Sequence, residues 1–141
     1  MEKQGQIIKG EQHKDVRGTI FFFNDFDMTV VRRFYRIKHH NTSAIRGWRG
    51  HKIEQRWFHV YRGSFEIKLV RIDNWEAPNP FLKATSMILQ AEEDIILHIP
   101  EGIATSLTAL SVNSEIIVFA DYAIDHASKD DYLYPVDYFK N

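Results

Sequence analysis

The chain of 141 residues contains no cysteine. This absence excludes a disulfide scaffold, a thiolate zinc site, an iron–sulfur cluster and a cysteine nucleophile. The chain also lacks an apolar run near the roughly 18–20 residues that a membrane span needs. Residues 1–15 are charged throughout and have no apolar stretch of about 7–15 residues, so we expect no signal peptide. These absences predict a cytoplasmic protein with no role at a membrane.

An excess of charge of either sign is missing as well. The chain has 18 basic and 19 acidic side chains, whereas a general nucleic-acid binder shows a strongly basic surface. We therefore expect no nucleic acid as a partner, and any basic site must be local. No repeat, low-complexity tract or Pro/Gly/Ser-rich linker divides the chain. Residues 1–141 are thus expected to form a single domain that buries roughly 68% of its unfolded surface.

Apolar and β-branched residues occur in ten short segments separated by turn residues, which is typical of an all-β sandwich or barrel. The expected strands are Gln6–Lys9, Thr19–Phe23, Thr29–Ile37, Ala44–Trp48, Gln55–Tyr61, Ser64–Ile72, Lys83–Gln90, Ile95–Ile99, Thr105–Leu110 and Glu115–Tyr122. Hairpin turns are expected at residues 62–64 and 113–114, and a loop at residues 74–80. From about residue 125 to residue 141 we expect a C-terminal tail that forms a short helix or wraps over the sheet.

Two of these segments mix basic and apolar residues on both faces. Strict alternation places Val31, Arg33, Tyr35 and Ile37 on one face of their strand. In residues 44–51 it places Arg49 and His51 on one face, and Arg46 and Trp48 on the other. A strand of this kind lies against solvent or lines a polar cavity.

The basic residues are concentrated between Arg32 and Lys52, where there are seven Arg and Lys side chains and no Asp or Glu. Guanidinium groups bind phosphate in a bidentate manner, and aromatic side chains stack on planar bases or sugars. Tyr35 and Trp48 lie within this basic stretch. The combination predicts an anionic ligand that contains a ring, such as a nucleotide sugar.

Several motifs occur here in an order and spacing that resemble a known family. They are Asp15-Val16-Arg17-Gly18, Arg33-Phe34-Tyr35, Arg46-Gly47-Trp48-Arg49-Gly50-His51-Lys52, Gln55, and Ala120-Asp121-Tyr122 followed by Asp131-Tyr132. The chain thereby resembles the cupin-type dTDP-sugar 3,4-ketoisomerases of the WxcM-like family. It resembles the dTDP-4-dehydrorhamnose 3,5-epimerases more distantly.

The resemblance implies an all-β fold, the cupin double-stranded β-helix or jelly roll, in a single domain. It also implies a homodimer, a dTDP-linked or similar nucleotide sugar in the barrel mouth, and no metal or other cofactor. A metal cupin has a further histidine shortly after its P-x-G turn, whereas Pro100-Glu101-Gly102 is followed by Thr105. The implied process is deoxysugar or surface-polysaccharide synthesis.

Arg49 departs from the family pattern, which has histidine at both positions 49 and 51. Arginine stays protonated at neutral pH, so Arg49 cannot act as a general base. We therefore expect His51 to be the base of a 3,4-ketoisomerisation, Tyr35 the acid, and Arg49 a group that stabilises the enediolate or binds phosphate. The nucleotide-sugar contacts implied by the motif positions are Arg17, Arg33, Arg46, Lys52 and Gln55.

Other functions remain open at the level of sequence. Arg49 is also compatible with a non-catalytic cupin that has lost its first histidine and only binds a nucleotide sugar. A metal-dependent cupin enzyme is a weaker alternative. A 3,5-epimerase is disfavoured, because residues 116–118 are Ile, Ile and Val where those enzymes carry a tyrosine acid.

Overall fold

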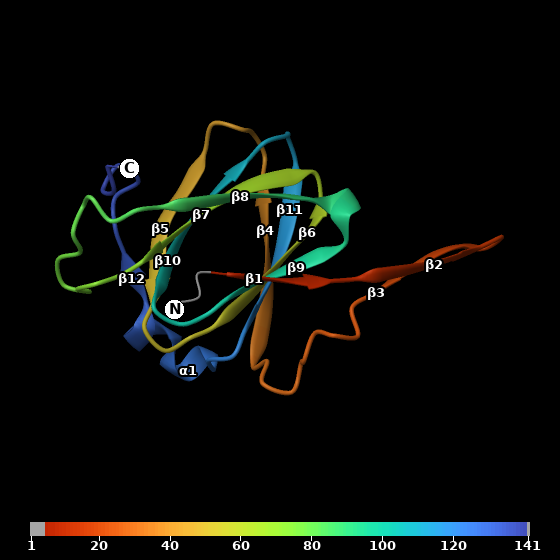
Figure 1. Ribbon diagram of the computed structural model, residues 1–141, viewed down its shortest axis with the longest axis horizontal. Coiled ribbons are helices and arrows are strands. Elements are labelled where there is room, and N and C mark those ends of the chain that lie inside the picture. Colours follow the sequence, from red (N-terminus) through yellow and green to blue (C-terminus); the bar gives the residue numbers. More distant parts are fainter. Residues whose placement is uncertain (1–4, 141) are drawn as a thin grey trace.

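The computed structural model describes residues 5–140, and two antiparallel five-stranded sheets form its body (Figure 1). The first sheet has the strand order β1 (Gln6–Lys9), β9 (Ile95–Ile99), β6 (Arg56–Arg62), β11 (Ser114–Ala120) and β4 (Arg33–His39). The order in the second is β12 (Tyr132–Leu133), β5 (Ile45–His51), β10 (Ile103–Ala109), β7 (Ser64–Arg71) and β8 (Thr85–Gln90). Strands that follow one another in the chain mostly belong to opposite sheets, as in a jelly roll. This confirms the predicted all-β cupin fold.

The hydrophobic core lies between the two sheets. Phe58 of β6, Leu97 of β9 and Ile116 of β11 meet Ile67 and Leu69 of β7, and all five are almost fully buried. Their inward positions follow the two-residue period of a strand. Between β4 and β5 the inward positions instead carry polar and charged side chains, so this side of the sandwich contains the candidate site.

Both sheets are also covered on an outer face. Phe26 packs on Trp57 with ring centroids 5.8 Å apart, so β6 is buried from both sides. On the second sheet Phe139 packs on Trp48 at 5.0 Å, and the Trp48 indole donates a hydrogen bond to the Val136 carbonyl. The C-terminal tail therefore wraps over the sheet, after the short helices α1 (Ile124–Ala127) and η2 (Ser128–Asp130). A further short helix, η1 (Ala91–Glu93), connects β8 to β9.

The hairpin of β2 (Glu11–Asp15) and β3 (Gly18–Phe22) forms a separate two-stranded sheet that projects from the body (Figure 1). The strand β2 was not predicted, because its five residues are polar and all exposed. Residues 29–32 were predicted as strand, but β4 begins only at Arg33. The Asp27 carboxylate accepts hydrogen bonds from the backbone and hydroxyl of Thr29, and this local turn competes with strand formation.

No helix within residues 5–140 is long and apolar enough to cross a membrane.

Candidate active site

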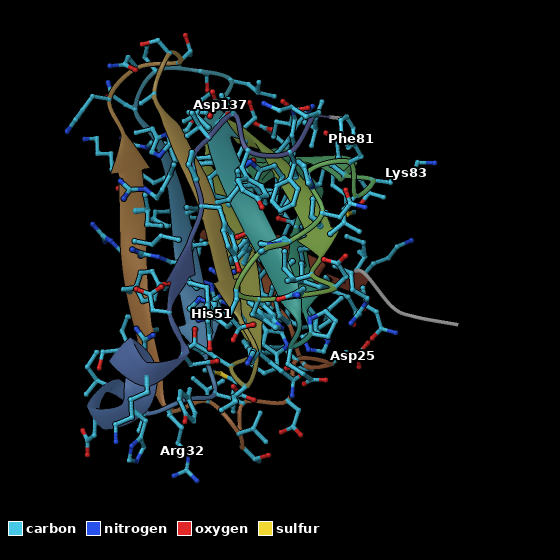
Figure 2. All side chains as sticks on the ribbon, turned by 90° about the vertical axis from the view of Figure 1, so that its left-hand side faces the viewer. Asp25, Arg32, His51, Phe81, Lys83 and Asp137 are labelled. Carbon is cyan, nitrogen blue, oxygen red and sulfur yellow. The ribbon has the colours of Figure 1, made fainter. Side chains whose placement is uncertain are left out.

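A cavity of about 620 Å³ lies between β4 and β5 and extends beneath the C-terminal helices. A second cavity of about 530 Å³ continues deeper into the sandwich, and Tyr35 and Arg49 line both. Their sizes fall within the range of small-molecule sites, roughly 300–1,000 Å³. In Figure 2 His51 lies nearer the end of the sandwich that carries Arg32 and α1, whereas Asp137 lies toward the other end.

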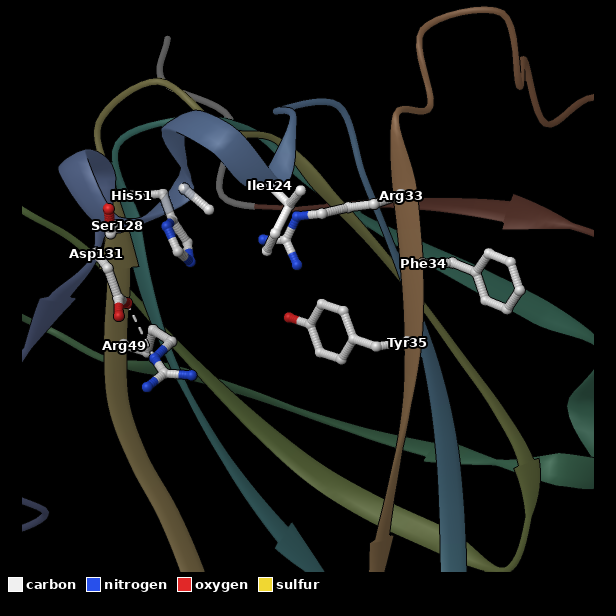
Figure 3. Close-up of a pocket in the computed structure, with 9 residues that line it drawn as sticks. Arg33, Phe34, Tyr35, Arg49, His51, Ile124, Ser128 and Asp131 are labelled. Atoms are coloured by element: carbon white, nitrogen blue, oxygen red, sulfur yellow. Dashed lines mark ion pairs between the residues drawn. The ribbon is translucent and has the colours of Figure 1, made fainter.

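One wall of the cavity comes from β4. Arg33 and Tyr35 point into the cavity, whereas Phe34 points away from it (Figure 3). The Arg33 guanidinium lies 5.3 Å from the centre of the Tyr35 ring, and its Nε donates to the Tyr122 carbonyl at 3.2 Å. The face that alternation predicted for Arg33 and Tyr35 is therefore the inner one.

The facing wall comes from β5, where a β-bulge changes which side chains face inward. Thr105 of β10 pairs with Arg49, but Leu107, two residues on, pairs with Arg46, three residues away on β5. The extra residue brings Arg46 and Arg49 to line the same cavity. Strict alternation placed these two arginines on opposite faces, and that prediction was wrong because the sequence pattern does not reveal the bulge.

Arg49 is oriented by the C-terminal tail. Its Nε lies 3.0 Å from Oδ1 of Asp131, an ion pair drawn as a dashed line in Figure 3. The Tyr35 hydroxyl points across the cavity toward this wall. A ligand between the two strands would therefore have a phenol on one side and a guanidinium on the other.

His51 is 5% exposed and is held by the segment that follows α1. Its Nδ1 lies 2.7 Å from the backbone carbonyl of Asp130, which can only accept, so Nδ1 carries a proton. The Asp130 carboxylate accepts hydrogen bonds from the backbone N–H groups of Lys52, Ile53 and Glu54. Asp130 thereby fixes both the turn after β5 and the tautomer of the imidazole.

The imidazole of His51 is neutral at physiological pH. Burial lowers its pKa from 6.5 to about 3, and the positive charges of Arg56, Arg49 and Arg33 contribute to this decrease. A neutral imidazole with a proton on Nδ1 has its free lone pair on Nε2.

Glu54 lies in the turn between β5 and β6, outside the cavity lining, and is 2% exposed. Its Oε1 accepts a hydrogen bond from Arg33 at 3.0 Å, and its Oε2 lies 3.6 Å from Nε2 of His51. Burial raises the pKa of this carboxyl, although the nearby Arg33 and Arg56 oppose the shift.

Arg56 is a further buried cation at the cavity. It donates a hydrogen bond to the Thr105 hydroxyl at 3.0 Å, and its guanidinium lies 5.1 Å from the centre of the Phe58 ring. Burial lowers its pKa, but neighbouring Tyr35 and Glu54 favour the charged form. Among residues 5–140, no carboxylate forms an ion pair with Arg46 or Arg56, and both arginines line the second cavity.

The structure thus brings five of the eight predicted site residues together: His51, Tyr35, Arg49, Arg33 and Arg46. The other three lie outside the cavity. Arg17 is at the tip of the β2–β3 hairpin, where it pairs with Asp15 at 2.6 Å. Lys52 is exposed, with its ammonium 5.5 Å from the Tyr132 ring. Gln55 hydrogen-bonds Asp121 and accepts a hydrogen bond from His98.

Sequence reasoning missed Arg56, Glu54 and the roles of the two aspartates. Arg56 was detectable, because it shares the inward face of Phe58 and Val60 on β6. Glu54 gave no signal, because it lies in a turn whose conformation depends on Asp130, 76 residues away in the chain. Within the described part of the chain, no group of three or more His, Asp or Glu side chains is arranged to hold a metal ion.

A jelly roll with a cation-lined cavity between β4 and β5 defines a cupin whose cavity is suited to an anionic ligand. Residues 3–141 match the family model described as FdtA: WxcM-like, C-terminal. The chain belongs to this family, as the motifs predicted. The comparison with curated proteins gives no match.

Several solved structures with the same fold are sugar-nucleotide isomerases and epimerases. The WlaRB TDP-quinovose 3,4-ketoisomerase of Campylobacter jejuni is 20% identical with a TM-score of 0.73, covering 99% of this chain and 100% of that one. A mutant of the 3,4-ketoisomerase QdtA of Thermoanaerobacterium thermosaccharolyticum, in complex with TDP-4-keto-6-deoxyglucose, is 19% identical with a TM-score of 0.71, covering 93% and 88%. The rmlC epimerase of Mycobacterium tuberculosis is 17% identical with a TM-score of 0.72, covering 92% and 68%. The chain therefore has the fold of an isomerase- or epimerase-like enzyme.

Proposed function

We propose that this protein is a metal-free 3,4-ketoisomerase of a nucleotide sugar of the dTDP-4-keto-6-deoxyhexose type. The observation that carries the proposal is the cavity in which a neutral imidazole, a phenol and several guanidinium groups face one another. Family membership supports it, and so do the fold neighbours that act on TDP sugars. Such an enzyme would serve deoxysugar or surface-polysaccharide synthesis in the cytoplasm.

The reaction moves a carbonyl from C4 of the sugar to C3 through an enediol. His51 removes the C3 proton with Nε2 and returns it to C4, so that one base serves both steps. Tyr35 protonates O4 as the enediol forms and accepts the proton of O3 as it collapses. Arg49, held by Asp131, stabilises the negative charge that develops on these oxygens.

The remaining arginines bind the nucleotide. Arg33 lines the first cavity and Arg46 the second, and guanidinium groups bind phosphate in a bidentate manner. Lys52, which lies outside the cavity beside Tyr132, adds positive charge to the surface near the site. Gln55 supports the site from outside through Asp121 and His98.

We also infer a homodimer. The β2–β3 hairpin projects from the body with Ile20 59% and Phe21 54% exposed, and a second copy would cover these side chains. Arg17 then reaches a nucleotide only in the partner subunit's cavity. Size-exclusion chromatography with light scattering should give twice the 16.6 kDa mass of the chain; a single-chain mass at micromolar concentration would contradict the dimer.

The alternative is a nucleotide-sugar-binding cupin without catalysis. Two observations favour it: Arg49 stands where the family has its first histidine, and burial makes His51 a weak base. Binding and turnover distinguish the two functions. Both predict saturable binding of dTDP-4-keto-6-deoxyglucose by calorimetry, but only the isomerase converts it to the 3-keto sugar.

The test is to incubate the protein with this sugar nucleotide and to identify the product by proton NMR. His51→Asn is the matched control, because its side-chain amide can still donate to the Asp130 carbonyl. We expect a 3-keto product with the wild type and none with the variant, at similar binding affinity. Saturable binding without product would favour the binding protein, and equal turnover by both would remove His51 from the mechanism.

A further inference from the structure

Two buried polar atoms face each other without a hydrogen bond beside the candidate base. Nε2 of His51 and Oε2 of Glu54 are 3.6 Å apart, and neither hydrogen-bonds any residue among those described. Since Nδ1 of His51 donates to the Asp130 carbonyl, Nε2 of the neutral ring carries a lone pair. An ionised Glu54 also presents only lone pairs. One proton between the two atoms would satisfy both.

The other charged groups around the imidazole are either positive or already paired, so Glu54 is the group that can share a proton with Nε2. Those that face it are Arg33 and Tyr35 from β4, Arg49 from β5, Arg56 from β6, and Asp130 and Asp131 from the tail. The three arginines oppose a positive charge on the ring. The Asp130 carboxylate already accepts hydrogen bonds from backbone N–H groups, and the Asp131 carboxylate forms an ion pair with Arg49. Glu54 uses only Oε1, for Arg33, so Oε2 is available to the imidazole.

We propose that Glu54 is a positioning residue that holds the transferred proton jointly with His51. The proposal rests on the 3,4-ketoisomerase function proposed above. When the C3–H bond breaks, its electron pair enters the enediolate and the proton binds Nε2, and the positive charge of the resulting imidazolium lies beside the Glu54 carboxylate, with Nε2 3.6 Å from Oε2. Reprotonation at C4 returns the same proton and restores the facing lone pairs. Glu54 thus stabilises the imidazolium that the arginines would otherwise disfavour.

The first test needs no substrate. The whole chain is labelled with ¹³C at glutamate carboxyls and ¹⁵N at histidine rings, and both signals are followed on acidification. A shared proton makes the Glu54 carboxyl and the His51 Nε2 signals move in one common step. In Glu54→Gln this step disappears from the His51 signal, and it persists in Glu92→Gln, which changes an exposed carboxylate. Glu54 titration that leaves the His51 Nε2 signal unmoved would overturn the proposal.

The second test measures turnover against pH. We expect Glu54→Gln to lower kcat on the order of 10- to 100-fold, as for loss of a hydrogen bond to a charged group, with little change in KM. Wild-type kcat rises with pH as Glu54 ionises, and this limb is absent in Glu54→Gln. Glu54→Asp restores part of kcat. Full activity of Glu54→Gln with an unchanged pH profile would contradict the role of Glu54.

Together the two tests distinguish failure of the proposed function from failure of the role of Glu54. A common titration step in a protein that converts no sugar nucleotide would overturn the proposed function, and the catalytic role of Glu54 with it. Independent titration of the two groups in an active enzyme would overturn the role of Glu54 alone.

Discussion

Acid should destabilise this protein through His51. The unfolded chain binds a proton on this imidazole below pH 6.5, whereas the folded protein binds it only near pH 3. Between these values the unfolded state carries more protons, so the stability is complete above pH 6.5 and is lost as the pH falls. Because pH 4.5 lies about two units below the unfolded pKa of 6.5, the unfolding free energy at this pH is lower by about 2 to 3 kcal/mol.

Urea denaturation followed by tryptophan fluorescence, at pH 7.5 and pH 4.5, measures this loss. His51→Asn removes the titrating group, so between these pH values the wild type should lose about 2 to 3 kcal/mol more than the variant. The wild type and His51→Asn are also compared with Glu54→Gln present in both proteins. The raised pKa of the Glu54 carboxyl stabilises the fold as the pH falls, opposite to His51, and this substitution removes that contribution. Equal losses in wild type and His51→Asn would refute the neutral, buried imidazole on which the mechanism depends.

Three further predictions concern the site and its supports. Arg46→Gln should weaken dTDP binding about tenfold in calorimetry, the loss of one charge-assisted contact of about 1.4 kcal/mol, and an unchanged Kd would place the nucleotide elsewhere. Asp130→Asn should destabilise the fold by about 1–3 kcal/mol in urea titrations, because an amide replaces the carboxylate that accepts the turn's N–H groups; no loss would show that this turn forms without it. Gly47→Ala should lower the unfolding free energy in urea titrations by about 1–3 kcal/mol, since a Cβ there would lie 2.4 Å from a Val136 methyl and 3.2 Å from its Cα. Wild-type stability of this variant would show that the tail can shift away from β5 without cost.

The sequence predicted the fold because local patterns determine it. Apolar alternation in β6 and β7 marks buried strands, and short segments between turns exclude a helical domain. Patterns of this kind depend only on neighbouring residues. Features that depend on contacts distant in the chain were not predicted: the polar strand β2 forms only by pairing with β3, and the bulge in β5 is visible only in its register with β10.

The candidate site was predicted in part for the same reason. Tyr35 and His51 carry chemistry that a motif displays directly, and both line the cavity. Asp130 and Glu54 have no motif, since their importance comes from a turn that meets the tail across 76 residues. Arg17 was grouped with the site by its motif, yet it lies on a hairpin away from the cavity of its own chain.

In the proposed mechanism His51 removes a proton from the sugar ring and returns it within this cavity. Proton NMR of dTDP-4-keto-6-deoxyglucose with stoichiometric protein in D₂O measures the first step directly, because it follows the C3 proton. We expect the C3–H signal to be lost as the 3-keto product forms, and both changes to be absent in His51→Asn. A C3–H signal that persists in the presence of saturating wild-type protein would contradict it.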